Sequence, residues 1–128
     1  MRKHPFDDPT GGIGEKYAVL SAAGLPRKRA VQLANLCAHC GYATLVCGEP
    51  REGDMIVAPQ SVGESELGEY VRVAHDCHAT LAIMAPALNR RRERICRQIV
   101  EAHTGTTVDN RGYLLIFNNH LPKQHFKL

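Results

Sequence analysis

The residues best suited to chemistry in this 128-residue chain are a pair of cysteines and a later pair of histidines. Cys37 and Cys40 are separated by two residues, and Gly41 follows Cys40 directly. Two thiolates at this spacing can hold one zinc ion if the chain turns tightly, and glycine permits such a turn. The pattern therefore predicts a zinc knuckle, in which the ion has a structural role.

Two further ligands are expected from the segment His75-Asp76-Cys77-His78. Residues three apart on a helix are neighbours, so His75 and His78 can reach one ion. His78 also falls within an apolar stripe, where a buried imidazole needs a partner. The predicted ligands are Cys37, Cys40, His75 and His78, with Cys77 and Cys47 as alternates. The competing interpretations are metal-free cysteines, a redox pair, or a core histidine bonded to a carbonyl.

The cysteine pair, taken together with residues 76–78, resembles the zinc frame of HNH-type nucleases over less than half of the chain. The resemblance implies a zinc-bound hairpin followed by a helix. It does not extend to nuclease chemistry, because Ala74 stands three residues before Cys77, where a partner is expected, and residues 54–60 contain no histidine to act as the base. An HNH-like or Cys/His enzyme is therefore the third hypothesis, and we favour a protein that is not an enzyme.

Two basic segments form the second candidate site. Residues 89–97 contain five arginines and one glutamate, and residues 27–29 place three cations in the first turn of an expected helix. Cations are disfavoured at a helix N-terminus, so a bound anion would explain them, although a solvated helix face is the competing interpretation. The predicted contacts are Arg27, Lys28, Arg29, Arg90, Arg91, Arg94 and Arg97.

The charge distribution and the aromatic content indicate the kind of partner. Residues 65–128 hold nine Lys/Arg and six Asp/Glu, so they account for the whole net charge of +3. The chain has no tryptophan, four tyrosines and three phenylalanines, which is poor material for stacking single-stranded bases. We therefore predict a nucleic-acid-binding accessory or regulatory protein that contacts a duplex backbone. The alternative is a protein-binding adaptor or inhibitor that acts on a nucleic-acid-processing enzyme through the same basic helix face.

Composition limits the class of protein. Five cysteines cannot all pair within one chain, and the first residues do not resemble a secretory signal, so we expect a cytoplasmic protein without a disulfide framework. No apolar run is long enough to cross a membrane. The length is that of one domain.

The predicted fold class is α+β, with three to four helices and two β-hairpins stapled by zinc. The expected helices span residues 14–23, 26–36, 64–84 and 86–103. The expected hairpins pair 42–47 with 55–58 and 106–108 with 113–117. We expect a flexible arm over residues 1–12, one domain over 13–119 and a polar tail over 120–128.

Overall fold

The computed structural model describes residues 13–119 and 121–128, which form four helices and a six-stranded sheet. The helices are α1 (Ile13–Ala22), α2 (Arg27–Cys40), α3 (Glu64–Asp76) and α4 (Arg90–Ala102). The strands are β1 (Leu45–Cys47), β2 (Met55–Ala58), β3 (Thr80–Met84), β4 (Thr106–Asp109), β5 (Tyr113–Ile116) and β6 (Gln124–Lys127). This small single domain of helices and a mixed sheet confirms the α+β fold class.

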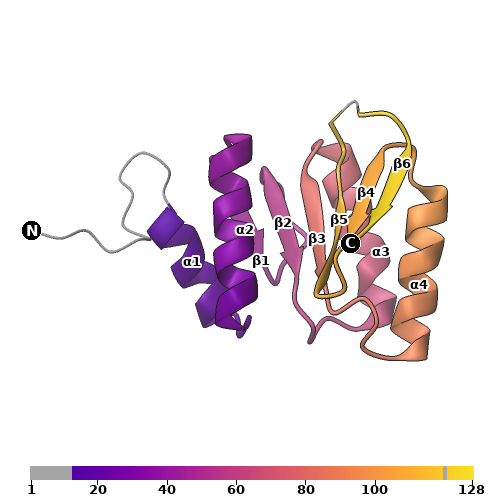
Figure 1. The fold of residues 1–128 in the computed structure, drawn as a ribbon, viewed down its shortest axis with the longest axis horizontal. Helices are drawn as coiled ribbons and strands as arrows, with labels where there is room; N and C mark the ends of the chain where they lie inside the picture. The colour runs from indigo at the N-terminus through magenta and orange to yellow at the C-terminus, as the bar shows by residue number, and fades with distance from the viewer. Residues whose placement is uncertain (1–12, 120) are drawn as a thin grey trace, which may run out of the picture.

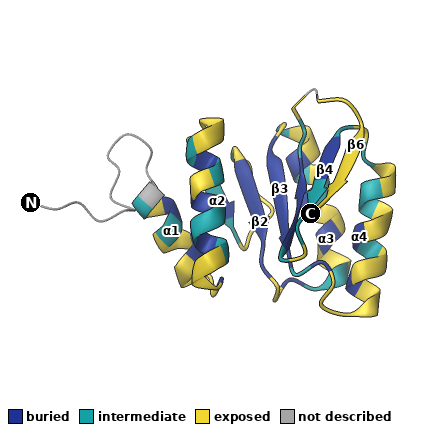
Figure 2. Cartoon of the chain, in the orientation of Figure 1, coloured by how far each residue is buried: buried dark blue, intermediate teal, exposed yellow. Residues whose placement is uncertain are grey.

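The elements form three layers (Figure 1), with α1 and α2 on one face of the sheet and α3 and α4 on the other. The strand order is β1-β2-β3-β5-β4-β6. Strands β1, β2 and β3 run parallel, whereas β5 runs antiparallel to both β3 and β4. Each face of the sheet has its own core cluster, and β2, β3 and β5 are buried almost throughout (Figure 2). None of the described helices is long and apolar enough to span a membrane.

The first predicted hairpin is wrong, because β1 and β2 are parallel neighbours. The Asp54 carboxylate, just before β2, accepts hydrogen bonds from the backbone N–H groups of Ala43 at 2.7 Å and Thr44 at 3.0 Å, just before β1. These bonds hold the first residues of β1 and β2 side by side, as a parallel pair requires. The connection over residues 48–54 can carry the chain back because β1 has only three residues, about 10 Å at 3.3 Å per residue.

The helix predicted over residues 64–84 is also wrong in its second half. It ends at Asp76, the chain reverses at His78 with φ 59°, and Thr80–Met84 form the buried strand β3. A strand covered on both faces is apolar at every position, so its sequence does not alternate and can pass for a buried helix. The helix expected over 86–103 begins later, at Arg90, where the Asn89 side chain caps it by accepting a hydrogen bond from the backbone N–H of Arg92.

The second predicted hairpin is confirmed by the antiparallel pair β4 and β5. The segment expected to be a polar tail instead contributes β6, which pairs in parallel with β4 through residues 124–127. The β6 side chains are exposed, so their sequence lacks the apolar signal of a core strand. The arm predicted over residues 1–12 lies outside the described residues.

Candidate anion-binding site

The two basic segments found in the sequence lie at the same edge of the domain, on opposite faces of the sheet. Helices α2 and α4 both begin at the edge where β2 and β3 end, which is the lower edge in Figure 1. The turn between β4 and β5, which contains Arg111, lies at the same edge. We call this surface the basic edge and define it by Arg27, Lys28, Arg29, Arg90, Arg91 and Arg111.

A pocket of about 540 Å³ opens on the basic edge. Its walls come from the loop between α1 and α2, the first turn of α2, the loops that follow β2 and β3, and the turn between β4 and β5. Arg29, Arg111, Gln60 and Ser61 supply polar groups, and none of the described lining residues is acidic. Ligands of open α/β sheets commonly bind beyond the carboxyl ends of parallel strands, which is where this pocket lies.

Local contacts hold Arg29 in this wall. Its guanidinium carbon lies 5.9 Å from the centroid of the Tyr113 ring, and its Nη1 donates a hydrogen bond to Gln32 Oε1 at 3.0 Å. Gly112 makes this position possible, because a Cβ at that residue would lie 2.1 Å from the guanidinium carbon. A cation packed against a tyrosine face and tethered at one nitrogen keeps donors available for an anion.

The floor of the pocket is held by a buried arginine that the sequence analysis missed. Arg92 is 1% exposed. Its guanidinium donates hydrogen bonds to the carbonyls of Pro59, Val62, Met84 and Ala85, at distances between 2.5 and 3.2 Å. These bonds tie the loop after β2 to the loop after β3. Among the described residues Arg92 forms no ion pair with a carboxylate, so the groups in direct contact with its guanidinium are backbone carbonyls.

Two strained backbone positions border the same pocket. Ala85 has φ 49° and Arg111 has φ 76°, which places both residues in the left-handed region. The Ala85 N–H donates a hydrogen bond to the Gly112 carbonyl at 2.9 Å, and the Arg111 N–H donates one to Asp109 Oδ1 at 2.8 Å. Left-handed backbone in residues other than glycine costs about 1–3 kcal/mol and is found most often at functional sites.

One acidic side chain on this edge is already committed to neighbouring groups. The pKa of the Glu64 carboxylate is lowered, first by its own backbone N–H, then by a hydrogen bond from Asn89, and also by the charges of Arg91 and Arg92. Arg29, Arg90 and Arg111 have no ion pair in the part of the chain that the structure describes. The basic edge therefore keeps an excess of positive charge.

The predicted zinc ligands are not brought together. Cys37 and Cys40 lie in the last turn of α2, and the tight turn comes after them at Gly41, with φ 71°. The cysteine pair therefore lies in a helical turn and not in the knuckle turn that the sequence predicted. Cys37 is fully buried, and its thiol donates a hydrogen bond to Met55 Sδ at 3.5 Å. Burial raises the pKa of this thiol to about 12, so it is protonated at neutral pH.

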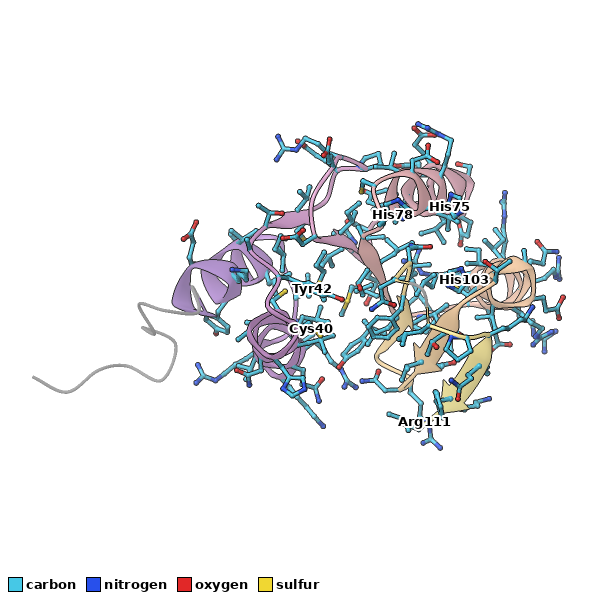
Figure 3. All side chains as sticks on the ribbon, turned by 90° about the horizontal axis from the view of Figure 1, so that it is seen from above. Cys40, Tyr42, His75, His78, His103 and Arg111 are labelled. Atoms are coloured by element: carbon cyan, nitrogen blue, oxygen red, sulfur yellow. The ribbon has the colours of Figure 1, made fainter. Side chains whose placement is uncertain are left out.

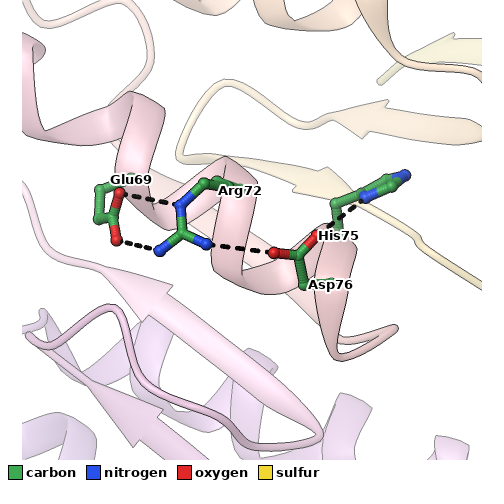
Figure 4. Close-up of polar contacts among 4 residues, drawn as sticks. All are labelled: Glu69, Arg72, His75 and Asp76. Carbon is green, nitrogen blue, oxygen red and sulfur yellow. Dashed lines mark hydrogen bonds and ion pairs between the residues drawn. The ribbon is translucent and has the colours of Figure 1, made fainter.

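The two histidines lie on the other side of the sheet from these cysteines (Figure 3). His75 is exposed at the end of α3, where its Nδ1 lies 3.5 Å from Asp76 Oδ1, and Asp76 in turn pairs with Arg72 (Figure 4). His78 is exposed, not within the apolar stripe as predicted, because α3 ends before it.

The alternate ligands also serve packing. Cys77 donates a hydrogen bond to the Gly53 carbonyl at 3.6 Å, and burial raises the pKa of Cys47 to about 11. In the described part of the chain, no three His, Cys, Asp or Glu side chains are grouped so that they could hold a metal ion. Zinc binding stays a prediction. The basic edge is the candidate site whose side chains the structure brings together around one pocket.

The remaining predicted arginines lie further along α4. Arg94 and Arg97 are exposed as expected, but they lie about 6 and 10 Å along the helix axis from its first residue. Arg97 also pairs with Glu93 at 3.6 Å. Arg92 could have been recognised, because it lies four residues before buried Cys96 on the same helix face. Arg111 had no sequence signal beyond its place in a turn.

Comparison with known proteins finds no matching family model, no matching curated protein and no matching solved structure. The fold and the site define the class as a small three-layer domain with a basic pocket at the carboxyl edge of its parallel strands.

Proposed function

We propose that this protein binds nucleic acid through the phosphate backbone, with the basic edge as the contact surface and an accessory or regulatory role. One observation carries the proposal: two basic segments about 60 residues apart in sequence, together with Arg111, gather at one edge of the domain. Arginine forks pair with phosphate oxygens in two-bond geometry, and clustered cations bind polyanions by releasing their counterions.

The predicted contact residues now divide into two groups. The first residues of α2 and α4 line the pocket or lie near it in the chain, and they are the proposed phosphate contacts. Arg94 and Arg97 extend the positive surface along α4, but they lie further from the pocket. Mutations near the start of α4 should therefore affect binding more than mutations near its end.

The test compares two double variants of equal charge. Arg90→Ala/Arg91→Ala removes two cations from the basic edge, whereas Arg51→Ala/Arg72→Ala removes two ion-paired cations from outside it. Affinity is measured by fluorescence anisotropy on a labelled 20-base-pair duplex and on its single strand, over a series of KCl concentrations.

The wild-type affinity should fall steeply with salt. The basic-edge variant should flatten the slope of log K against log salt by about two, because each lost phosphate contact removes about 0.9 from it. The control variant should keep a slope close to that of the wild type. Absence of binding at 50 mM KCl, or equal losses in the two double variants, would reject the proposal.

A further inference from the structure

The pocket on the basic edge has two chemically different sides. Leu25, Met84 and Leu88 contribute apolar side chains, whereas Arg29 and Arg111 contribute the cationic groups. Leu88 is 48% exposed although it is a large aliphatic residue. A pocket of about 540 Å³ is of the size that takes whole small molecules, and it is much larger than a bare phosphate ion would fill.

The cationic side is preformed. Arg29 is packed on Tyr113 and bonded to Gln32, and in the described residues that is its one hydrogen bond. Helix α2 begins nearby at Arg27, and Pro26 before it supplies no side-chain cap to the first N–H groups of the helix. An anion in the pocket would therefore meet a fixed guanidinium and the positive end of a helix dipole.

Hydrogen bonds from a buried side chain make the floor of the pocket rigid. Pro59, Met84 and Ala85 line the pocket, and the buried guanidinium of Arg92 holds all three carbonyls. A charge buried below the floor is less screened by solvent than an exposed one, so it adds to the positive potential. A rigid floor also lowers the ordering cost of binding.

We propose that this pocket binds one nucleoside phosphate, with its phosphate between Arg29 and Arg111 and its base against the apolar side formed by Leu25, Met84 and Leu88. This inference deepens the proposed function. It rests on that function only if the ligand is the end of a bound nucleic-acid strand. The nucleoside phosphate is either the phosphorylated end of a bound strand or a free nucleotide. Gln60 and Ser61 are placed to bond the sugar or the base edge.

Calorimetric titration with adenosine 5′-monophosphate, adenosine and inorganic phosphate tests the ligand class. The nucleotide should bind at least about tenfold more tightly than either fragment, because only the nucleotide engages both sides of the pocket. A nucleotide that binds no more tightly than inorganic phosphate would overturn the inference.

Two variants test the site. Arg29→Gln should weaken nucleotide binding about tenfold or more, whereas the matched control Arg72→Gln, outside the pocket, should not change it. Gly112→Ala keeps the charge but places a methyl group where the Arg29 guanidinium lies, so it should also weaken binding. Equal affinity for Arg29→Gln and Arg72→Gln would refute the assignment, and an unchanged melting curve for Arg29→Gln makes the comparison valid.

Oligonucleotides separate the two sources and the two proposals. A 12-mer that binds more tightly with a 5′-phosphate than without one identifies the strand end as the ligand, whereas nucleotide binding without this preference identifies the free nucleotide. If Arg90→Ala/Arg91→Ala weakens 12-mer binding while adenosine monophosphate does not bind, the pocket inference fails and the proposed function stands. If the nucleotide binds but no oligonucleotide does, the proposed function fails and the pocket inference stands.

Discussion

Replacing Arg92 by methionine should destabilise the domain strongly, although it removes a buried charge. The guanidinium makes five hydrogen bonds to four carbonyls, and it is 1% exposed. Methionine has a similar length and no donor, so these carbonyls lose their partner. Each hydrogen bond from a charged donor contributes about 1.5–3 kcal/mol, and each buried acceptor left without a donor costs about 1–3 kcal/mol.

The variant also escapes the desolvation cost of the buried charge, so the net loss is smaller than the sum of the bonds. We expect the free energy of unfolding to fall by about 3–5 kcal/mol, which is a large part of the total for a domain of this size. Urea unfolding followed by circular dichroism should show a midpoint lower by about 2 M with an unchanged slope. Arg94→Met on the same helix, at an exposed position, should change stability by less than about 0.5 kcal/mol.

A fall of less than about 1 kcal/mol for Arg92→Met would refute the reasoning, because it would mean that water replaces the guanidinium at no cost. Arg92→Lys should be intermediate. A single ammonium has three donors on one nitrogen, so it cannot span both loops as the planar guanidinium does. An equal loss in the lysine and methionine variants would show that the planar geometry, rather than the charge, holds the loops.

Further predictions concern the cysteines. Cys37→Ser should lower the free energy of unfolding by about 1–3 kcal/mol, because it buries a hydroxyl beside a thioether. Cys40→Ser, at an exposed position, should be nearly neutral in thermal melts. Unfolding of the wild-type protein on chelation would instead support the zinc interpretation. Stability should also fall as the pH rises above 9, because burial raises the thiol pKa of Cys37 from 9.0 to about 12 and those of Cys47 and Cys96 to about 11. The folded state then keeps protons that the unfolded state has lost, so each thiol lowers the free energy of unfolding by at most about 1.4 kcal/mol per pH unit between pH 9 and 11. A flat pH profile over this range would contradict these pKa values.

Local sequence determined the elements whose signals are local. The amphipathic spacing that predicted α2 is borne out by buried Ala30, Leu33 and Cys37, and the turn residues between β4 and β5 correctly indicated a hairpin. The exposed arginines of α4 were also readable, because a helical wheel separates them from the buried face. Such signals depend on residues within a few turns of one another, so no tertiary information is needed.

Tertiary structure decided the direction of the strands and the composition of the site. The apolar run of β3 fits a buried helix as well as a strand, and only its pairing with β2 and β5 settles which it is. The cysteine and histidine pairs, which look complementary in sequence, lie on opposite faces of the sheet. The basic segments at residues 27–29 and 90–91, which look unrelated in sequence, lie at the same edge of the domain. The start of α4 lies at this edge because α4 follows β3, and the carboxyl ends of parallel strands share one edge of a sheet. Helix α2 precedes β1 and runs against its direction, so α2 begins at the same edge although it is far from α4 in the chain.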